Sequence, residues 1–285
     1  MPEQITLAAP AKINLSLDIT GIMDNGYHAL ESVFQTVSIC DSITVSRNFS
    51  DEITVHSSNA LIPNDNRNIA YKAAEKFAAY TGADISGVDI FIKKRIPMQA
   101  GLGGGSTDGA AVLKALNYLF MNNSVSDDTL CRIGAETGAD VPFFIKGGIA
   151  FAEGIGDKLT PLNPLPKLWL VIAKGKSGIS TVEAYKKIDT IKNIKHPDTK
   201  KILTAIESGN LNALFKECAN VFELAADLDD IGVIKSVMLA EHAQCALMTG
   251  SGSAVFGIFP TRKHADYCCR RLKGIMPYAA VCSTI

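Results

Sequence analysis

The glycine-rich segment GLGGGST at residues 101–107 offers the clearest chemistry in this chain. It lies between an expected strand and an expected apolar helix. Glycines allow backbone N–H groups to approach an anion closely, and the first turn of a helix favours negative charge. A flexible strand-to-helix connection is the alternative, but flexible loops rarely hold four glycines followed by a helix-capping pair such as Ser106 and Thr107. The segment therefore predicts a phosphate-binding loop.

This loop matches none of three common functional motifs. The P-loop pattern GxxxxGK[ST] fails because Leu170 occupies the first glycine position ahead of the only GKS, at residues 175–177. The dinucleotide fingerprint GxGxxG fails at Asp108, and the same residue breaks the GxSxG nucleophile pattern around Ser106. Acyl transfer thereby loses its best candidate nucleophile, while phosphate binding by the backbone remains.

Four further segments could supply functional groups, and each has a plain structural alternative. Lys12, in APAKIN, could be a solvated surface charge, and Asp140, in GADVPFF, could be an ordinary turn residue. Tyr27 and His28 follow the turn signature DNG and could lie in an exposed turn. The glycine cluster TGSGS at 249–253 could be a tight hairpin or a second backbone wall around a bound anion or substrate.

The elements that must position these residues are strands and helices in irregular alternation. Alternating or β-branched segments predict strands at residues 13–20, 42–47, 53–57, 88–93, 149–153 and 168–173. Helical spacing predicts helices at 68–80, 106–121, 126–137, 181–188, 198–208, 210–218, 231–242 and 261–274, with a strand before and after the last. The strand at 13–20 is expected to bury only one face. Without a regular βαβ rhythm, an α+β fold is expected rather than a doubly wound sheet.

Composition limits the class of protein. The 285 residues carry 28 Lys+Arg against 29 Asp+Glu, so the net charge of −1 argues against a broad nucleic-acid or anionic-membrane surface. Seven cysteines without a CxxC pair indicate free thiols in a reducing compartment, and five scattered histidines give no structural zinc site. With no signal peptide and no apolar stretch of about 18 residues, a cytoplasmic protein is expected.

Taken in order, these segments resemble the GHMP small-molecule kinases. The matching segments are PAKINLSLDITG, DNGYHALES, PMQAGLGGGSTDGAA, GADVPFF and LMTGSGSAVF, which span about residues 8–259. The resemblance implies a two-domain α+β fold, with an N-terminal ATP-binding domain over 1–156, a C-terminal domain over 157–285 and the active site in the cleft between them. The turn-rich segment 154–166 suits that boundary. Gly109 departs from the family pattern, where alanine is commoner, and should cost about 0.5–1 kcal/mol in a helix.

The resemblance also implies a role for each matching residue. Lys12 and Asp140 match the catalytic pair. The residues that match the ATP site are Pro97, Met98, Gln99, Ala100, Gly101, Leu102, Gly103, Gly104, Gly105, Ser106, Thr107, Asn68 and Lys94. The residues that match the substrate site are Asn14, Tyr27, His28, Thr181, Tyr185, Gly250 and Ser251. Among these, Tyr185 is expected to sandwich a cytosine ring against Tyr27.

The GYH segment and GADVPFF point, within the superfamily, to kinases of a cytidine diphosphate-linked methylerythritol. The implied reaction transfers the ATP γ-phosphoryl group to the substrate 2-hydroxyl, giving ADP and the 2-phosphate in the non-mevalonate route to isoprenoid precursors. Asp140 would accept the hydroxyl proton, and Lys12 would keep it ionised. Mg²⁺ would be held mainly by the phosphates, with a hydroxyl of Ser106 or Thr107 as a protein ligand and no dedicated carboxylate site.

Two alternatives to this reading stay open. One is another kinase of the superfamily, acting on mevalonate, homoserine or a sugar, which would share the glycine loop without needing a cytosine pocket. The other is a catalytically silent nucleotide-binding module, against which the presence of both Lys12 and Asp140 argues. In either case we expect a small-molecule partner, no nucleic acid, no membrane, and a monomer or weak homodimer.

Overall fold

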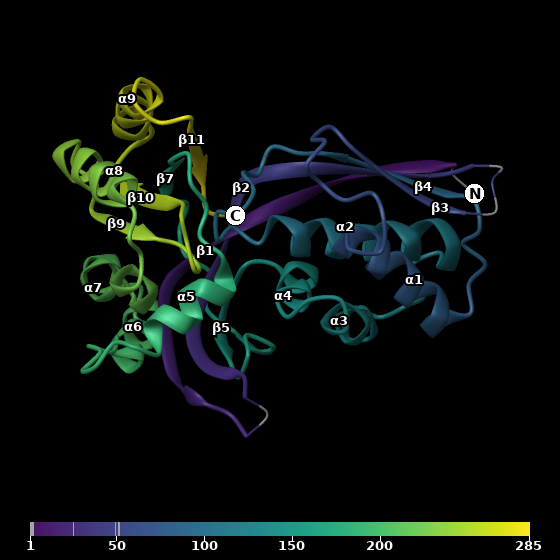
Figure 1. The fold of residues 1–285 in the computed structure, drawn as a ribbon, viewed down its shortest axis with the longest axis horizontal. Helices are drawn as coiled ribbons and strands as arrows, with labels where there is room; N and C mark the ends of the chain where they lie inside the picture. Colours follow the sequence, from purple (N-terminus) through teal and green to yellow (C-terminus); the bar gives the residue numbers. More distant parts are fainter. Residues whose placement is uncertain (1–2, 25, 49, 51) are drawn as a thin grey trace. The chain divides into compact units, whose positions relative to one another are not determined.

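The computed structural model describes residues 3–24, 26–48, 50 and 52–285, and the chain forms two compact units (Figure 1). The first unit consists of Met1–Ala11, Ile39–Ile96 and Gly103–Gly147. The second consists of Lys12–Ser38, Pro97–Leu102 and Gly148–Ile285. The units thus alternate along the chain, whereas the expected domains 1–156 and 157–285 are consecutive; those ranges stay a prediction.

The first unit is a sheet with four helices gathered on one side of it (Figure 1). Its strands follow the order β3-β4-β2-β1. They are β3 (Ile53–Ser57), β4 (Val88–Lys93) and the parts of β2 (His28–Arg47) and β1 (Gln4–Ile22) that belong to this unit. The helices are α1 (Ile69–Thr81), α2 (Gly104–Met121), α3 (Asp127–Ala135) and α4 (Val141–Lys146), and α2 contacts the other three. This arrangement fixes the glycine loop at the start of α2.

The second unit contains an antiparallel sheet of order β11-β7-β10-β9, on which α8 and α9 pack. These elements are β7 (Trp169–Lys174), α8 (Asp229–Ala240), β9 (Cys245–Met248), β10 (Val255–Phe259), α9 (Arg262–Lys273) and β11 (Tyr278–Ser283). The others are β5 (Ile149–Glu153), β6 (Lys158–Pro161), α5 (Thr181–Ile188), α6 (Thr199–Glu207), α7 (Leu211–Glu217), β8 (Ala219–Asn220) and η1 (Val221–Leu224). Strand β8 runs parallel to β1 at Ser16 and Leu17, while β5 pairs with β2 at Ser32–Gln35.

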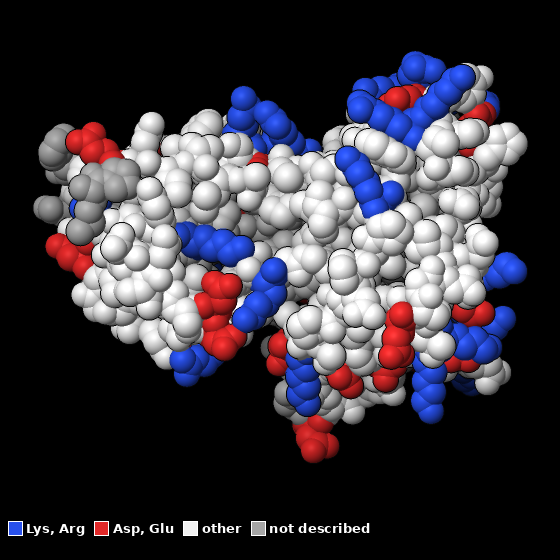
Figure 2. Space-filling view, turned by 180° about the vertical axis from the view of Figure 1, so that it is seen from behind, with Lys and Arg blue, Asp and Glu red and all other residues white. Residues whose placement is uncertain are grey.

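The surface over α9 is rich in basic side chains, as the blue atoms at the upper right of Figure 2 show. Three of these residues, Arg270, Arg271 and Lys273, lie in the last turn of α9, where cations complement the partial negative charge of a helix C-terminus. Arg271 also pairs with Glu241. None of the helices in the described part of the chain combines the length and the apolarity that a membrane crossing needs.

The α+β class is confirmed, and most predicted helices are found within two residues of their expected ends. The elements that were missed are the first parts of β1 and β2, residues 4–12 and 28–41, the short helix α4, the short strands β6 and β8, and η1. The segment 154–166, expected to be a boundary, contains β6, which pairs with β5 inside the second unit.

Strand β1 corrects an expectation about burial. One buried face was predicted for residues 13–20, because polar and apolar side chains alternate there. In the structure both faces are buried, and the polar Lys12, Asn14, Ser16 and Asp18 are as inaccessible as their apolar neighbours. The alternation of polar and apolar residues therefore separates a polar buried face of β1 from an apolar buried face, and neither face is exposed to water.

Helix α2 corrects two expectations about the glycine loop. It begins at Gly104, with Gly103 in the left-handed conformation as its N-cap, so Ser106 and Thr107 lie in the first turn instead of capping it. Gly109 serves close packing, because a Cβ there would lie 2.7 Å from the Ile69 Cγ2 atom of α1. An alanine would not gain the helix-propensity advantage that the sequence pattern suggested.

Candidate active site

Lys12 is a buried lysine on β1, with only 4% of its surface exposed. Its ammonium donates a hydrogen bond to Asn14 Oδ1 at 2.8 Å and lies 4.5 Å from the centre of the Phe34 ring. Its backbone N–H donates to the carbonyl of Leu102 in the glycine segment, at 3.1 Å. Because burial of an ammonium is costly unless polar groups and π faces surround it, these contacts exclude the solvated surface charge that was the alternative.

Asn14 connects this lysine to the second glycine cluster. Its Oδ1 atom accepts hydrogen bonds from Lys12 Nζ, from Thr249 Oγ1 at 3.1 Å and from the Gly250 backbone N–H at 2.9 Å. Its Nδ2 atom donates to Ser32 Oγ at 2.8 Å. Asn14 was expected at the substrate end of the site. In the structure its side chain is buried and holds Lys12 against the 249–250 backbone, and its role at the substrate stays a prediction.

The second glycine cluster, residues 249–253, joins the antiparallel strands β9 and β10, so the hairpin alternative describes its topology correctly. It is also packed backbone to backbone against the start of the first glycine segment. A Cβ at Gly101 would overlap the Thr249 carbonyl, and a Cβ at Gly250 would lie 2.8 Å from Gly101 Cα. Both glycines have positive φ, at 72° and 56°. Only glycine allows this approach without strain.

The residues predicted for the substrate site form two small groups in the second unit. Thr181, at the start of α5, shares a hydrogen bond of 3.0 Å with Ser251 Oγ. His28 stacks on Tyr185 with ring centres 4.5 Å apart, and its Nε2 atom lies 2.7 Å from Asp189 Oδ1. These contacts join β2 to α5. They bring together His28 and Tyr185, two of the residues expected to bind the cytidine end of the substrate.

Tyr27 lies just before β2 and exposes 62% of its surface, as the exposed-turn alternative predicted. Asn25, in the turn signature that precedes it, lies outside the described residues. An exposed aromatic ring next to the partly buried His28 can stack on a planar ligand. The sandwich of a cytosine between Tyr27 and Tyr185 stays a prediction.

In the first unit, the start of α2 has the features of an anion site. The N-cap Gly103 has no side chain to cover the N–H groups of the first turn. A Cβ on Gly104 would come within 3.3 Å of Lys94 Nζ, so glycine there leaves room for the ammonium. Ser106 Oγ lies 3.6 Å from the position of a Cβ on Gly138, which places this hydroxyl beside the GADVPFF segment.

Asp140 is the N-cap residue of α4, and its side chain makes no capping bond to that helix. It is half-buried and its backbone lies in a turn, as the turn-residue alternative predicted, while its catalytic role stays a prediction. The carboxylate of Asp140 is thus not used to cap its own helix. Ser106 thus lies beside Gly138, which comes two residues before Asp140 in the same unit.

Asn68 and Lys94, which were expected near the adenosine, have structural roles in the first unit. Asn68 caps α1, accepting from the Ala70 N–H at 2.9 Å and donating to the Pro63 carbonyl at 2.7 Å. The Lys94 ammonium is buried between Asp41 and Asp108, with the Asp108 Oδ2 atom at 2.8 Å. Their predicted roles at ATP stay predictions.

The two carboxylates around Lys94 cannot both be ionised at low cost. Burial raises the pKa of Asp108 to about 8, against the lowering effect of Lys94, and the charge of Asp41 adds to the rise. Although burial opposes it, the two carboxylates together raise the pKa of Lys94. At neutral pH Asp108 is therefore mainly protonated, beside the Lys94–Asp41 ion pair.

Comparison with known proteins shows the family of this chain. Residues 68–148 match the family model of the GHMP kinases N terminal domain. A 4-diphosphocytidyl-2-C-methyl-D-erythritol kinase from Clostridium tetani is 47% identical over 270 residues, which cover 94% of this chain and 95% of the relative. The chain belongs to this family of GHMP kinases.

Solved structures agree with this family assignment. A crystal structure of 4-(cytidine 5'-diphospho)-2C-methyl-D-erythritol kinase is 31% identical, covers 98% of this chain and 99% of its own, and has a TM-score of 0.81. A homoserine kinase from Cytophaga hutchinsonii has the same TM-score over 100% of this chain and 95% of its own, but at 17% identity it shares the fold alone.

Sequence reasoning missed several residues that organise the site of this GHMP kinase. Thr249 and Ser32 hold Asn14, Asp41 and Asp108 hold Lys94, and Asn220 holds the backbone around Gly250. Thr249 is part of the TGSGS cluster, and Asp108 is the residue that breaks the GxGxxG and GxSxG patterns, so the sequence drew attention to both positions. Nothing in the local sequence marks Asn220 as a residue of the site, because the two carbonyls to which it donates lie 28 and 30 positions away.

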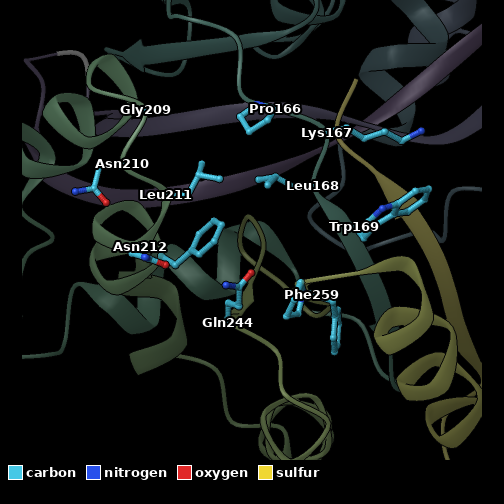
Figure 3. Close-up of a pocket in the computed structure, with 12 residues that line it drawn as sticks. Pro166, Lys167, Leu168, Trp169, Gly209, Asn210, Leu211, Asn212, Gln244 and Phe259 are labelled. Carbon is cyan, nitrogen blue, oxygen red and sulfur yellow. The ribbon is translucent and has the colours of Figure 1, made fainter.

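A cavity of about 590 Å³ in the second unit lies apart from these groups. Figure 3 shows its wall of aromatic and aliphatic side chains, among them Trp169, Leu168 and Phe259, with Gln244 at its side. None of the residues predicted for the site lines it.

Proposed function

We propose that this chain transfers the γ-phosphoryl group of ATP to the 2-hydroxyl of 4-diphosphocytidyl-2-C-methyl-D-erythritol, giving ADP and the 2-phosphate, a step of the non-mevalonate route to isoprenoid precursors. The observation that carries the proposal is the 47% identity over nearly the whole chain to a kinase named for that substrate. The buried Lys12, fixed by Asn14 to the second glycine cluster, gives the proposal a chemical basis.

In this proposal Lys12 and Asp140 are the catalytic pair. A hydroxyl is a poor nucleophile at neutral pH, and Asp140 accepts its proton as the new P–O bond forms. Lys12 offsets the charge on the oxygens of the transferred group, and its low exposure strengthens that effect. Since phosphoryl transfer often passes through a loose transition state, holding Lys12 in place matters as much as basicity.

The ATP phosphates bind at the first turn of α2, where the N–H groups after Gly103 have no side-chain cap. Mg²⁺, when bound to those phosphates, would neutralise part of their charge. Of the two hydroxyls considered as its ligand, Ser106 fits because it is partly exposed on that turn, whereas Thr107 is buried. Ser106 is therefore the protein group that we assign to Mg²⁺.

The cytidine end of the substrate binds in the second unit, at Tyr27, His28 and Tyr185. The stacked His28 and Tyr185 rings and the exposed Tyr27 ring offer aromatic faces, and His28 offers a ring nitrogen to a base edge. Thr181 and Ser251, already hydrogen-bonded to each other, face the rest of the substrate.

A substrate panel tests this proposal. Purified protein is incubated with ATP and Mg²⁺ and, separately, with 4-diphosphocytidyl-2-C-methyl-D-erythritol, mevalonate and homoserine, and ADP release is measured. We expect a kcat/KM for the cytidine substrate at least about 10³-fold above the others, because the other alcohols cannot use the base-binding groups. Preferred phosphorylation of mevalonate or homoserine, or no ADP release with any alcohol, would contradict it.

A further inference from the structure

Asn220 is a buried asparagine that none of the motifs includes. It ends the two-residue strand β8, where it lies opposite Leu17 of β1, and only 5% of its surface is exposed. The second glycine cluster begins directly after β9, with which β8 is in contact. Asn220 therefore sits between the strand that carries Lys12 and the hairpin that carries Gly250.

The amide group of Asn220 is fully used by that hairpin and by its own turn. Its Nδ2 atom donates one hydrogen bond to the Met248 carbonyl and one to the Gly250 carbonyl, both at 2.8 Å. Its Oδ1 atom accepts from the Phe222 N–H at 3.0 Å. An asparagine has two amide donors, so a single side chain fixes both ends of the Met248–Gly250 segment.

The same segment is held from a second direction by Asn14. The Gly250 N–H and Thr249 Oγ1 both donate to Asn14 Oδ1, which also accepts from Lys12 Nζ. A shift of Gly250 would therefore change the hydrogen bonds of the atom that holds the Lys12 ammonium. Buried carbonyls that lose their donors drive such a shift, because their desolvation is no longer compensated.

We propose that Asn220 is a positioning residue for phosphoryl transfer: by fixing the 248–250 backbone, it sets where Asn14 holds the Lys12 ammonium. The inference rests on the proposed function. Asn220 acts through Gly250 and Asn14 and touches neither ATP nor the alcohol. Its loss is expected to lower kcat, since small misplacements of a catalytic group cost up to about 10²-fold in rate.

The test compares Asn220→Asp with Asn117→Asp. Aspartate has the shape of asparagine but no amide donors. Asn117 is an equally buried asparagine in the first unit, whose amide bonds to the N–H and carbonyl of Val125. We expect Asn220→Asp to lower kcat at least about tenfold and to change the KM for ATP less than about threefold. Asn117→Asp should lower thermal stability and leave the kcat of the folded protein unchanged.

Asn220→Ser keeps one small donor, which cannot reach both carbonyls. This variant replaces Asn220→Asp in the test if the aspartate variant does not fold. A folded Asn220→Asp or Asn220→Ser protein with the kcat of the wild type would overturn the inference, as would equal losses of kcat in the Asn220 and Asn117 variants. Failure of the proposed function is distinct, because the wild type itself would then release no ADP with the cytidine substrate.

Discussion

Lys12 shows which features of a site the sequence predicts and which it does not. The motif around it was enough to nominate the lysine, since APAKIN matches a family segment. Its environment could not be predicted, because Asn14 finds Thr249 and Gly250 more than 230 positions away in the chain. Sequence patterns report local neighbours, whereas the pocket of a buried charge is made by distant ones.

Asp108 is the residue for which the structure adds a pH dependence. Its pKa in the folded chain is about 8, against an ordinary value of 3.8, so between these values the folded protein binds a proton that the unfolded chain has released. Stability therefore falls as pH rises through that window, by at most about 1.4 kcal/mol for each pH unit. Above pH 8 the cost of the ionised carboxylate is constant.

Asp108→Asn removes this proton while keeping the shape of the side chain. We expect the melting temperature of the variant to exceed that of the wild type by a margin that grows by several degrees between pH 5 and pH 9, because the amide cannot ionise. Melting temperatures at pH 5, 7 and 9 measure the difference. Two curves that stay parallel across this range would show that Asp108 does not take up a proton on folding.

At the scale of elements, β1 shows why a clear alternating pattern led to a wrong prediction of which strand face is buried. Alternation of polar and apolar residues is typical of a strand with one face in water. Here the polar face carries Lys12 and Asn14, whose side chains bond to each other, and Asn14 also bonds to Ser32 of β2 and to the β9–β10 hairpin. The strand was predictable from its period, but its polar face belongs to the site and not to solvent.

The close contact between α1 and α2 at Gly109 predicts how an alanine there changes the stability of the protein. Gly109→Ala should destabilise the protein by about 1–3 kcal/mol, because the new methyl group meets the stiff Ile69 side chain at 2.7 Å. Gly232→Ala, in α8, meets nothing within 4 Å and should stabilise by about 0.5–1 kcal/mol. Urea unfolding of both variants measures the two free energies. Equal stabilisation by both alanines would contradict the close packing at Gly109.

At the scale of the whole molecule, the near-neutral charge fits a kinase of small phosphorylated substrates. A net charge of −1 argues against a broad basic surface, and Figure 2 shows one group of basic side chains over α9 with others spread over the same face. The groups proposed for phosphate are instead backbone N–H groups at α2 and the buried Lys12. Anions can be held this way without excess positive charge, because helix termini supply fixed partial charges.

The fold class could be predicted because it depends on the order of strands and helices, which local periodicity reveals. The two units could not, because they are defined by distant contacts. The segment Pro97–Leu102, for example, belongs with residues after 148 through bonds such as Ala254 N–H to the Ala100 carbonyl. Half of the glycine segment thus supports Lys12 and the hairpin, and the other half begins α2.

The central claim, that Asp140 is the base in phosphoryl transfer from ATP to 4-diphosphocytidyl-2-C-methyl-D-erythritol, is tested most directly by the kcat of Asp140→Asn. Asp227→Asn, at an exposed aspartate, is the matched control. The account predicts that Asp140→Asn binds ATP and the cytidine substrate with unchanged affinity while kcat falls at least about 10²-fold, and that the control keeps the kcat of the wild type. A kcat for Asp140→Asn within about threefold of the wild type would contradict it.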